Sequence, residues 1–86
     1  MKICWFHLMA YRHLPPDFEQ KYRSVWVDPP SRLFDAEKAH VLYSEYLDEL
    51  EHAAQVGFDG VCVNEHHNNA YGIMPSPNLM AATLTR

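Results

Sequence analysis

A long amphipathic segment between two short apolar runs dominates this sequence. Across residues 35–57, apolar side chains recur at the three- and four-residue spacing of a helix that buries one face. They are Ala39, Leu42, Tyr43, Tyr46, Leu47, Leu50, Ala53 and Ala54. Asp35 is a residue type that caps helix N-termini, and Gly57 suits the left-handed position that ends a helix. The segment therefore predicts one long helix, whose solvated acidic face consists of Glu37, Glu45, Asp48, Glu49 and Glu51.

The two apolar runs predict strands on either side of this helix. Residues 2–9 contain large apolar and aromatic side chains and no turn former, which is typical of a strand buried on both faces. Residues 61–64 form a second, shorter run of this kind. The order strand, helix, strand predicts an α/β fold with a βαβ unit, whose strands are parallel and end at the same edge of the sheet. We therefore expect the residues just past Met9 and just past Asn64 to meet.

Composition narrows the classes of partner and compartment. The chain has 86 residues, of which 48% are apolar, so it holds one small domain at most. Its formal net charge of -4, with the histidines counted neutral, argues against binding to nucleic acid. No apolar run approaches the roughly 20 residues that span a bilayer, so no membrane insertion is expected. Cys4 and Cys62 lie inside apolar runs, the first beside Trp5 and Phe6, which favours reduced core thiols and a cytoplasmic location.

Residues 10–34 are predicted to form a long loop. Proline pairs at residues 15–16 and 29–30 disfavour helix there, and only a short helical turn across residues 17–22 is expected. The loop carries the aromatic residues Tyr11, Phe18, Tyr22, Trp26 and Phe34. A packed lid explains so many aromatic side chains better than a disordered linker does.

A second loop, residues 68–75, follows the second strand. After it, Ser76 has the character of a helix N-cap and Pro77 that of a first helical residue. An apolar run then begins, which predicts the start of a further helix. No signal for the end of that helix precedes Arg86.

The run Asn64, Glu65, His66 and His67 lies at the predicted end of the second strand. In α/β sheets, ligands and catalytic groups collect at that edge. Imidazole also gives or takes a proton near neutral pH. Because side chains alternate along an extended chain, we expect Glu65 and His67 on one side and Asn64 and His66 on the other.

The residues alone leave three interpretations of this edge open. His66 has the chemistry of a general acid or base. Glu65 and His67, with His7 from the neighbouring strand, have the donor types of a metal site. The histidines would otherwise only satisfy backbone groups at the rim. Neither a glycine-rich phosphate loop nor a nucleophile elbow accompanies the motif, which excludes the common nucleotide-binding and esterase signatures.

The residues around the second strand also carry a family resemblance. Residues 58–67, which read Phe-Asp-Gly-Val-Cys-Val-Asn-Glu-His-His, together with residues 71–72 and 74–82, resemble the luciferase-like flavin-dependent monooxygenase family. Residues 1–9 and 47–57 also look like the first repeat of that family. The resemblance therefore covers nearly the whole chain.

The resemblance implies a (β/α)8 TIM barrel. Residues 1–86 would then be a partial barrel domain, with the first two strands, the first helix and the start of the next helix. Because such barrels need about 250 residues, the chain is expected to be an N-terminal fragment that is inactive alone. The full-length protein is expected to be an oligomer.

The resemblance also implies the chemistry. Enzymes of this family use reduced flavin and O2 to oxygenate a small organic substrate, and a flavin reductase is the expected partner. FMN is the expected flavin, although some relatives use a deazaflavin. The motif assigns the catalytic role, as general base or proton donor, to His66, with Glu65, His67, Asn64 and His7 as supporting or substrate-binding residues. The contacts to the flavin phosphate, and most contacts to the flavin ring, are expected from residues beyond Arg86.

Overall fold

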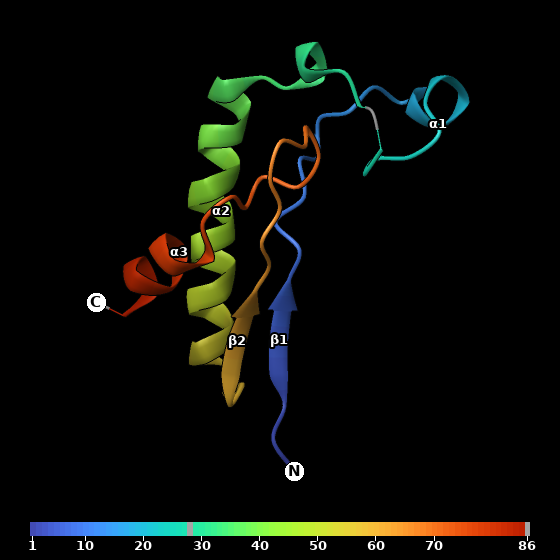
Figure 1. The fold of residues 1–86 in the computed structure, drawn as a ribbon. Helices are drawn as coiled ribbons and strands as arrows, with labels where there is room; N and C mark the ends of the chain where they lie inside the picture. Colours follow the sequence, from blue (N-terminus) through green and yellow to red (C-terminus); the bar gives the residue numbers. More distant parts are fainter. Residues whose placement is uncertain (28, 86) are drawn as a thin grey trace.

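The computed structural model describes residues 1–27 and 29–85. The elements in chain order are β1 (Cys4–His7), α1 (Phe18–Lys21), the 3-10 helix η1 (Ser31–Leu33), α2 (Ala36–Gln55), β2 (Gly60–Val63) and α3 (Pro77–Leu84). Strands β1 and β2 are parallel, with Cys4 opposite Gly60 and His7 opposite Val63. Helix α2 lies along the pair, α3 lies beside α2, and α1 stands away from the sheet (Figure 1). The chain is thus a small mixed α/β unit, and the predicted parallel βαβ order is confirmed.

The ends of α2 follow the predicted signals. The Asp35 carboxylate accepts hydrogen bonds from the backbone N–H groups of Glu37, at 3.0 Å, and Lys38, at 3.2 Å. Gly57 follows the helix with a φ of 97°, which other residues rarely adopt.

The two shorter helices were also expected. The helical turn in the first loop is confirmed as α1. Helix α3 begins at Pro77, as expected, but the side chain of its N-cap, Ser76, makes no capping hydrogen bond. The end of the chain at Arg86, beyond which the flavin contacts were expected, lies outside the described residues.

We expect Asp35→Ala to lower the melting temperature more at about pH 7 than at about pH 2. Backbone hydrogen bonds, first from Lys38 and then from Glu37, lower the pKa of Asp35 below its ordinary value of 3.8. Because the folded-state pKa is lowered, the stabilisation is present above the unfolded pKa and is lost as pH falls through the folded pKa. Thermal unfolding monitored by circular dichroism at both pH values measures the difference. Asp35→Asn keeps the capping oxygen without the charge, so its cap should persist at both; an Ala deficit that is equal at the two pH values would contradict the argument.

The main core lies between α2 and the segments that follow the two strands. Its buried members are Met9, Tyr11, Ala39, Leu42, Tyr46, Ile73, Met74 and Met80. The Tyr46 hydroxyl donates to the carbonyl of Ala10, and the Tyr43 hydroxyl donates to the carbonyl of Ile73. Burial raises the pKa of both phenols, which therefore remain protonated donors over the physiological range. The core is thus built at the carboxyl ends of the strands.

The prediction that the first strand is buried on both faces is wrong. Residues opposite each other in register share a face, so Phe6 and Cys62 point the same way, as does Cys4. All three are exposed, Phe6 by 60%. The reason is that α2 covers only one face of the two-stranded sheet, and the other face has no covering layer within the described residues. Cys4 and Cys62 are therefore free surface thiols and not core residues.

Trp5 is also not a core residue. It packs edge-on against Phe58, with ring centroids 5.4 Å apart, but remains 41% exposed. With Glu49 and Ala53 of α2 it lines an apolar groove of about 340 Å³. This groove lies near the amino ends of the strands, away from the rim where α/β sheets collect their ligands. At the same end of α2, Ala54 is exposed and marks the edge of the buried stripe.

In the described part of the chain, no helix has both the length and the apolar character needed to cross a bilayer. The longest helix, α2, combines its apolar stripe with many charged residues.

Candidate functional site

The carboxyl ends of β1 and β2 meet, as predicted. The Asn64 side-chain amide donates to the carbonyl of His7, at 3.0 Å, and to that of Leu8. Further on, Ala10 and Gly72 form an isolated antiparallel bridge. The Asn64 Oδ1 atom is buried and has no hydrogen-bond partner among the described residues. Asn64 thus ties the two strand ends together and leaves one polar atom unsatisfied at the rim.

Met9 makes the turn that leads the chain away from β1. It is fully buried and has a φ of 51°, a left-handed conformation that is uncommon for residues other than glycine. Its carbonyl accepts from the N–H of Ile73 at 3.3 Å, and its own N–H donates to His7 Nδ1 at 3.0 Å. The packing around Met9 therefore maintains a strained backbone at the strand end.

His7 is turned toward α2. Because Nδ1 accepts from Met9 N–H, the neutral ring carries its proton on Nε2, which donates to Glu49 Oε2 at 2.7 Å. His7 is only 8% exposed, and the centroid of its ring lies 4.6 Å from that of the Tyr46 ring. Glu49 was predicted on a solvated face; it is exposed, but it also reaches back to hold this histidine. The His7 side chain is therefore hydrogen-bonded to α2 and does not face Glu65 and His67.

The Glu65 and His67 side chains lie on one side, as expected, with Glu65 Oε1 2.7 Å from His67 Nε2. Both side chains are well exposed to solvent. The structure does not bring them together with His7, which pairs with Glu49 instead. Across residues 1–27 and 29–85, no group of three or more histidine, cysteine or acidic side chains has the geometry to hold a metal ion. The three-ligand metal site is therefore not formed in this structure.

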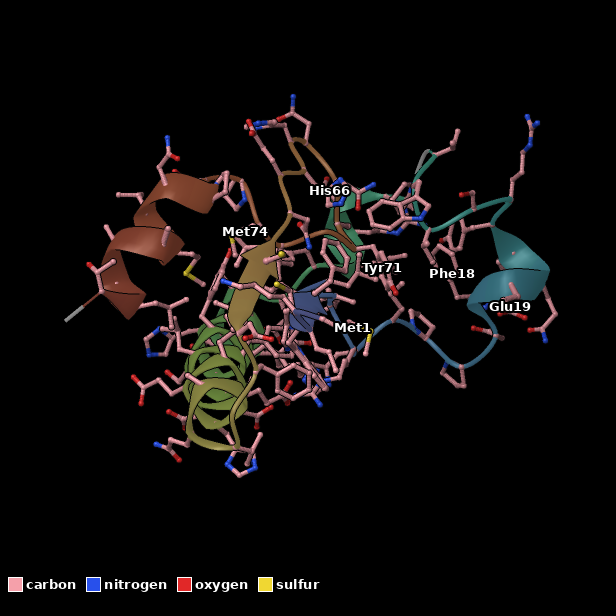
Figure 2. All side chains as sticks on the ribbon, turned by 90° about the horizontal axis from the view of Figure 1, so that it is seen from below. Met1, Phe18, Glu19, His66, Tyr71 and Met74 are labelled. Carbon is pink, nitrogen blue, oxygen red and sulfur yellow. The ribbon has the colours of Figure 1, made fainter. Side chains whose placement is uncertain are left out.

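His66 points to the other side of the chain, into the rim. Its ring lies 4.5 Å from the Trp26 ring, at an interplanar angle of 39°. A Cβ atom built on Gly72 would lie 2.8 Å from the His66 Cβ, closer than real Cβ contacts come. Gly72 is therefore required for the backbone to pass this close to His66. Figure 2 shows His66 and Tyr71 near each other, facing the segment that joins α1 to η1.

A cleft of about 140 Å³ opens beside His66. Its lining residues are Phe34, Tyr43, His66, Asn68, Asn69, Gly72, Ile73 and Pro75. None of them is a lysine, arginine, aspartate or glutamate. A larger neighbouring hollow, of about 420 Å³, shares Phe34, Asn68 and Asn69 with the cleft. Among these lining residues, His66 is the one histidine.

Sequence reasoning missed three residues of this site. Trp26 was recognised only as one of several aromatic residues in a loop. Gly72 and Asn69 lie in the predicted second loop, residues 68–75, where neither was assigned a role. An asparagine shortly before a glycine is a signal for an Asx turn. This signal could have indicated that the Asn69 side chain bonds to the backbone of the residues that follow it. No local pattern indicates the contact with Trp26.

No family model, curated protein or solved structure matches this chain. Its function therefore has to follow from the geometry of the rim.

Proposed function

We propose that this chain is the N-terminal βαβ portion of a (β/α)8 barrel of the luciferase-like flavin-dependent monooxygenase type. In this proposal the complete enzyme uses reduced flavin and O2 to oxygenate a small organic substrate. His66 acts in that reaction as the general base or proton donor. The uncovered sheet face supports the barrel. In such barrels the helices lie outside and the inward side chains of the strands pack together. Here α2 covers one face, while Phe6 and Cys62 present apolar surface on the other.

The observation that carries the catalytic proposal is the placement of His66. Its ring borders an uncharged cleft just past the end of β2, at the strand edge where barrel enzymes place catalytic groups. His7 and His67 are each paired with a carboxylate, whereas the contacts of the His66 ring are with Trp26 and Gly72. An imidazole in this position is suited to donate or accept a proton at a bound substrate or cofactor.

The rim fits the ring portion of a flavin better than its phosphate. The cleft lining contains the aromatic side chains of Phe34 and Tyr43 and the imidazole of His66. The cleft lining contains no lysine or arginine to bind a phosphate. When bound, reduced flavin supplies the electrons for oxygen activation. The residues that line the cleft would border the flavin ring, and His66 would donate or accept a proton beside it.

The test is an anaerobic titration of the protein that carries this chain with reduced FMN and, in parallel, with reduced riboflavin. We expect saturable binding of one flavin per chain, measured as quenching of the tryptophan emission. Substituting Phe34→Ala, in the cleft wall, should weaken binding, while His40→Ala, on the exposed side of α2, should not. Absence of saturable binding of either flavin would contradict the proposal.

A second candidate function is a module that binds a partner chain. The exposed apolar side chains Phe6 and Cys62, on a sheet with unpaired edges among the described residues, favour it because such surfaces pair readily with another chain. The oligomeric state of the sample used for the flavin titration, measured by sedimentation, distinguishes the partner-binding module from the enzyme. Defined association without flavin binding favours the module, and flavin binding favours the enzyme.

A further inference from the structure

The side chain of Asn69 connects two segments that are far apart in the sequence. Its Nδ2 group donates to the carbonyl of Val25 at 3.2 Å and to that of Trp26 at 3.3 Å. Its Oδ1 atom accepts from the N–H of Tyr71 at 2.7 Å and from that of Gly72 at 2.8 Å. An asparagine amide has two donor hydrogens and an oxygen with two lone pairs. Asn69 therefore uses its full hydrogen-bonding capacity at this single point.

Each of the two segments contacts His66 directly. Trp26 lies against the imidazole, with centroids 4.5 Å apart, and its ring also meets Tyr71 edge-on at 5.0 Å. Gly72 passes so close to His66 that no side chain fits between them. The orientation of the His66 ring thus depends on two backbones that Asn69 holds in register. Figure 2 shows His66 and Tyr71 in this cluster.

Trp26 is only partly buried against the rim. Its side chain is 42% exposed, and its own N–H bonds locally to the Ser24 hydroxyl. The Asn69 amide provides two hydrogen bonds from the rim to the backbone of this segment. Removing those donors should therefore loosen the packing of Trp26 against His66 and Tyr71.

We propose that Asn69 is the positioning residue of His66, because it clamps Trp26 and Gly72 around the imidazole. This role rests on the proposed function of His66, but the geometry that it predicts is measurable without any turnover. Asn69 also lines the cleft, but in this proposal it acts on His66 through Trp26 and Gly72.

Asn69→Asp separates the two halves of the clamp. Aspartate keeps the oxygen that accepts from Tyr71 and Gly72, but it replaces the donor with an oxygen that faces the carbonyls of Val25 and Trp26. In a Trp5→Phe background, Trp26 is the single tryptophan. We expect its emission to shift to longer wavelength and its quenching by acrylamide to increase. The ring-current shift of the His66 Hε1 proton in NMR spectra should decrease, while the far-UV circular dichroism stays unchanged.

The matched control is Asn78→Asp, which makes the same charge change on the exposed side of α3 and should leave both signals unchanged. If Asn69→Asp does not fold, Trp26→Ala tests the same ring contact at a position that is 42% exposed, and a decrease in the His66 shift is again expected. Unchanged Trp26 emission and His66 shift in a folded Asn69→Asp variant would overturn the proposal, as would an unchanged His66 shift in Trp26→Ala.

An activity measurement separates this proposal from the proposed function. If flavin turnover is present, Asn69→Asp should lower kcat and displace the pH profile of kcat, and Asn69→Gln should not restore either, because its longer side chain misplaces the amide. A normal kcat and pH profile in Asn69→Asp would overturn the positioning role. If the parent protein shows no turnover while the Trp26 and His66 signals respond as expected, the proposed function of the site is wrong, but the role of Asn69 in holding Trp26 and Gly72 around His66 is supported.

Discussion

Replacing His66 with alanine should lower kcat of the proposed flavin-dependent reaction about 10²- to 10⁴-fold, the usual loss when a general acid or base is removed. The ring borders the uncharged cleft, and the lining contains no second histidine, aspartate or glutamate that could act as a general acid or base in its place. Flavin affinity should change much less, because Phe34 and Tyr43 still line the cleft. Stopped-flow turnover with reduced flavin, together with a flavin titration of the same variant, measures both quantities.

His52→Ala is the control for loss of an imidazole elsewhere. His52 is exposed on α2, at the end of the molecule away from the rim, so this variant should retain the parent rate. His66→Ala with a parent-like kcat and intact flavin binding would show that the imidazole has no catalytic role.

Leu50→Ala should have the largest effect on folding. Leu50 is 1% exposed in the buried stripe of α2, and removing a buried leucine side chain costs about 2–5 kcal/mol through lost transfer energy and the cavity left behind. The total stability of a small domain lies near the lower end of the usual range, at about 5 kcal/mol. Urea unfolding followed by circular dichroism should therefore show a midpoint at a much lower urea concentration than that of the parent protein.

Leu79→Ala provides the matched comparison, since it deletes the same atoms from a helix position that is 70% exposed. Its effect should stay within about 0.5 kcal/mol, as for most surface substitutions. Equal losses at Leu50 and Leu79 would mean that the α2 stripe does not support the fold.

The features that the sequence predicted are those encoded by neighbouring residues. Asp35 and Gly57 bound α2 because capping and left-handed turns depend on a few adjacent positions. Glu65 and His67 share a side because side chains alternate along extended backbone. An apolar run, however, indicates that a strand is suited to burial without showing what covers it, which is why Cys4 was expected in the core.

The features that the sequence did not predict depend on contacts between distant residues. Glu49 meets His7 across 42 positions, and Asn69 meets Trp26 across 43. Each of these partners has an ordinary local role, on a helix surface or in a loop. Their pairing follows from the way α2 and the two rim segments pack, which no single stretch of sequence specifies.

The two tyrosines of α2 have a mechanical consequence. Tyr43 and Tyr46 lie three residues apart on one face of the helix, and each holds the backbone of a different rim segment, at Ile73 and at Ala10. The helix is therefore hydrogen-bonded to both segments through two side chains of one face. A displacement of α2 along its axis would carry Ala10 and Ile73 in the same direction, so the spacing between the two strand exits would be preserved while the whole rim moves as one body.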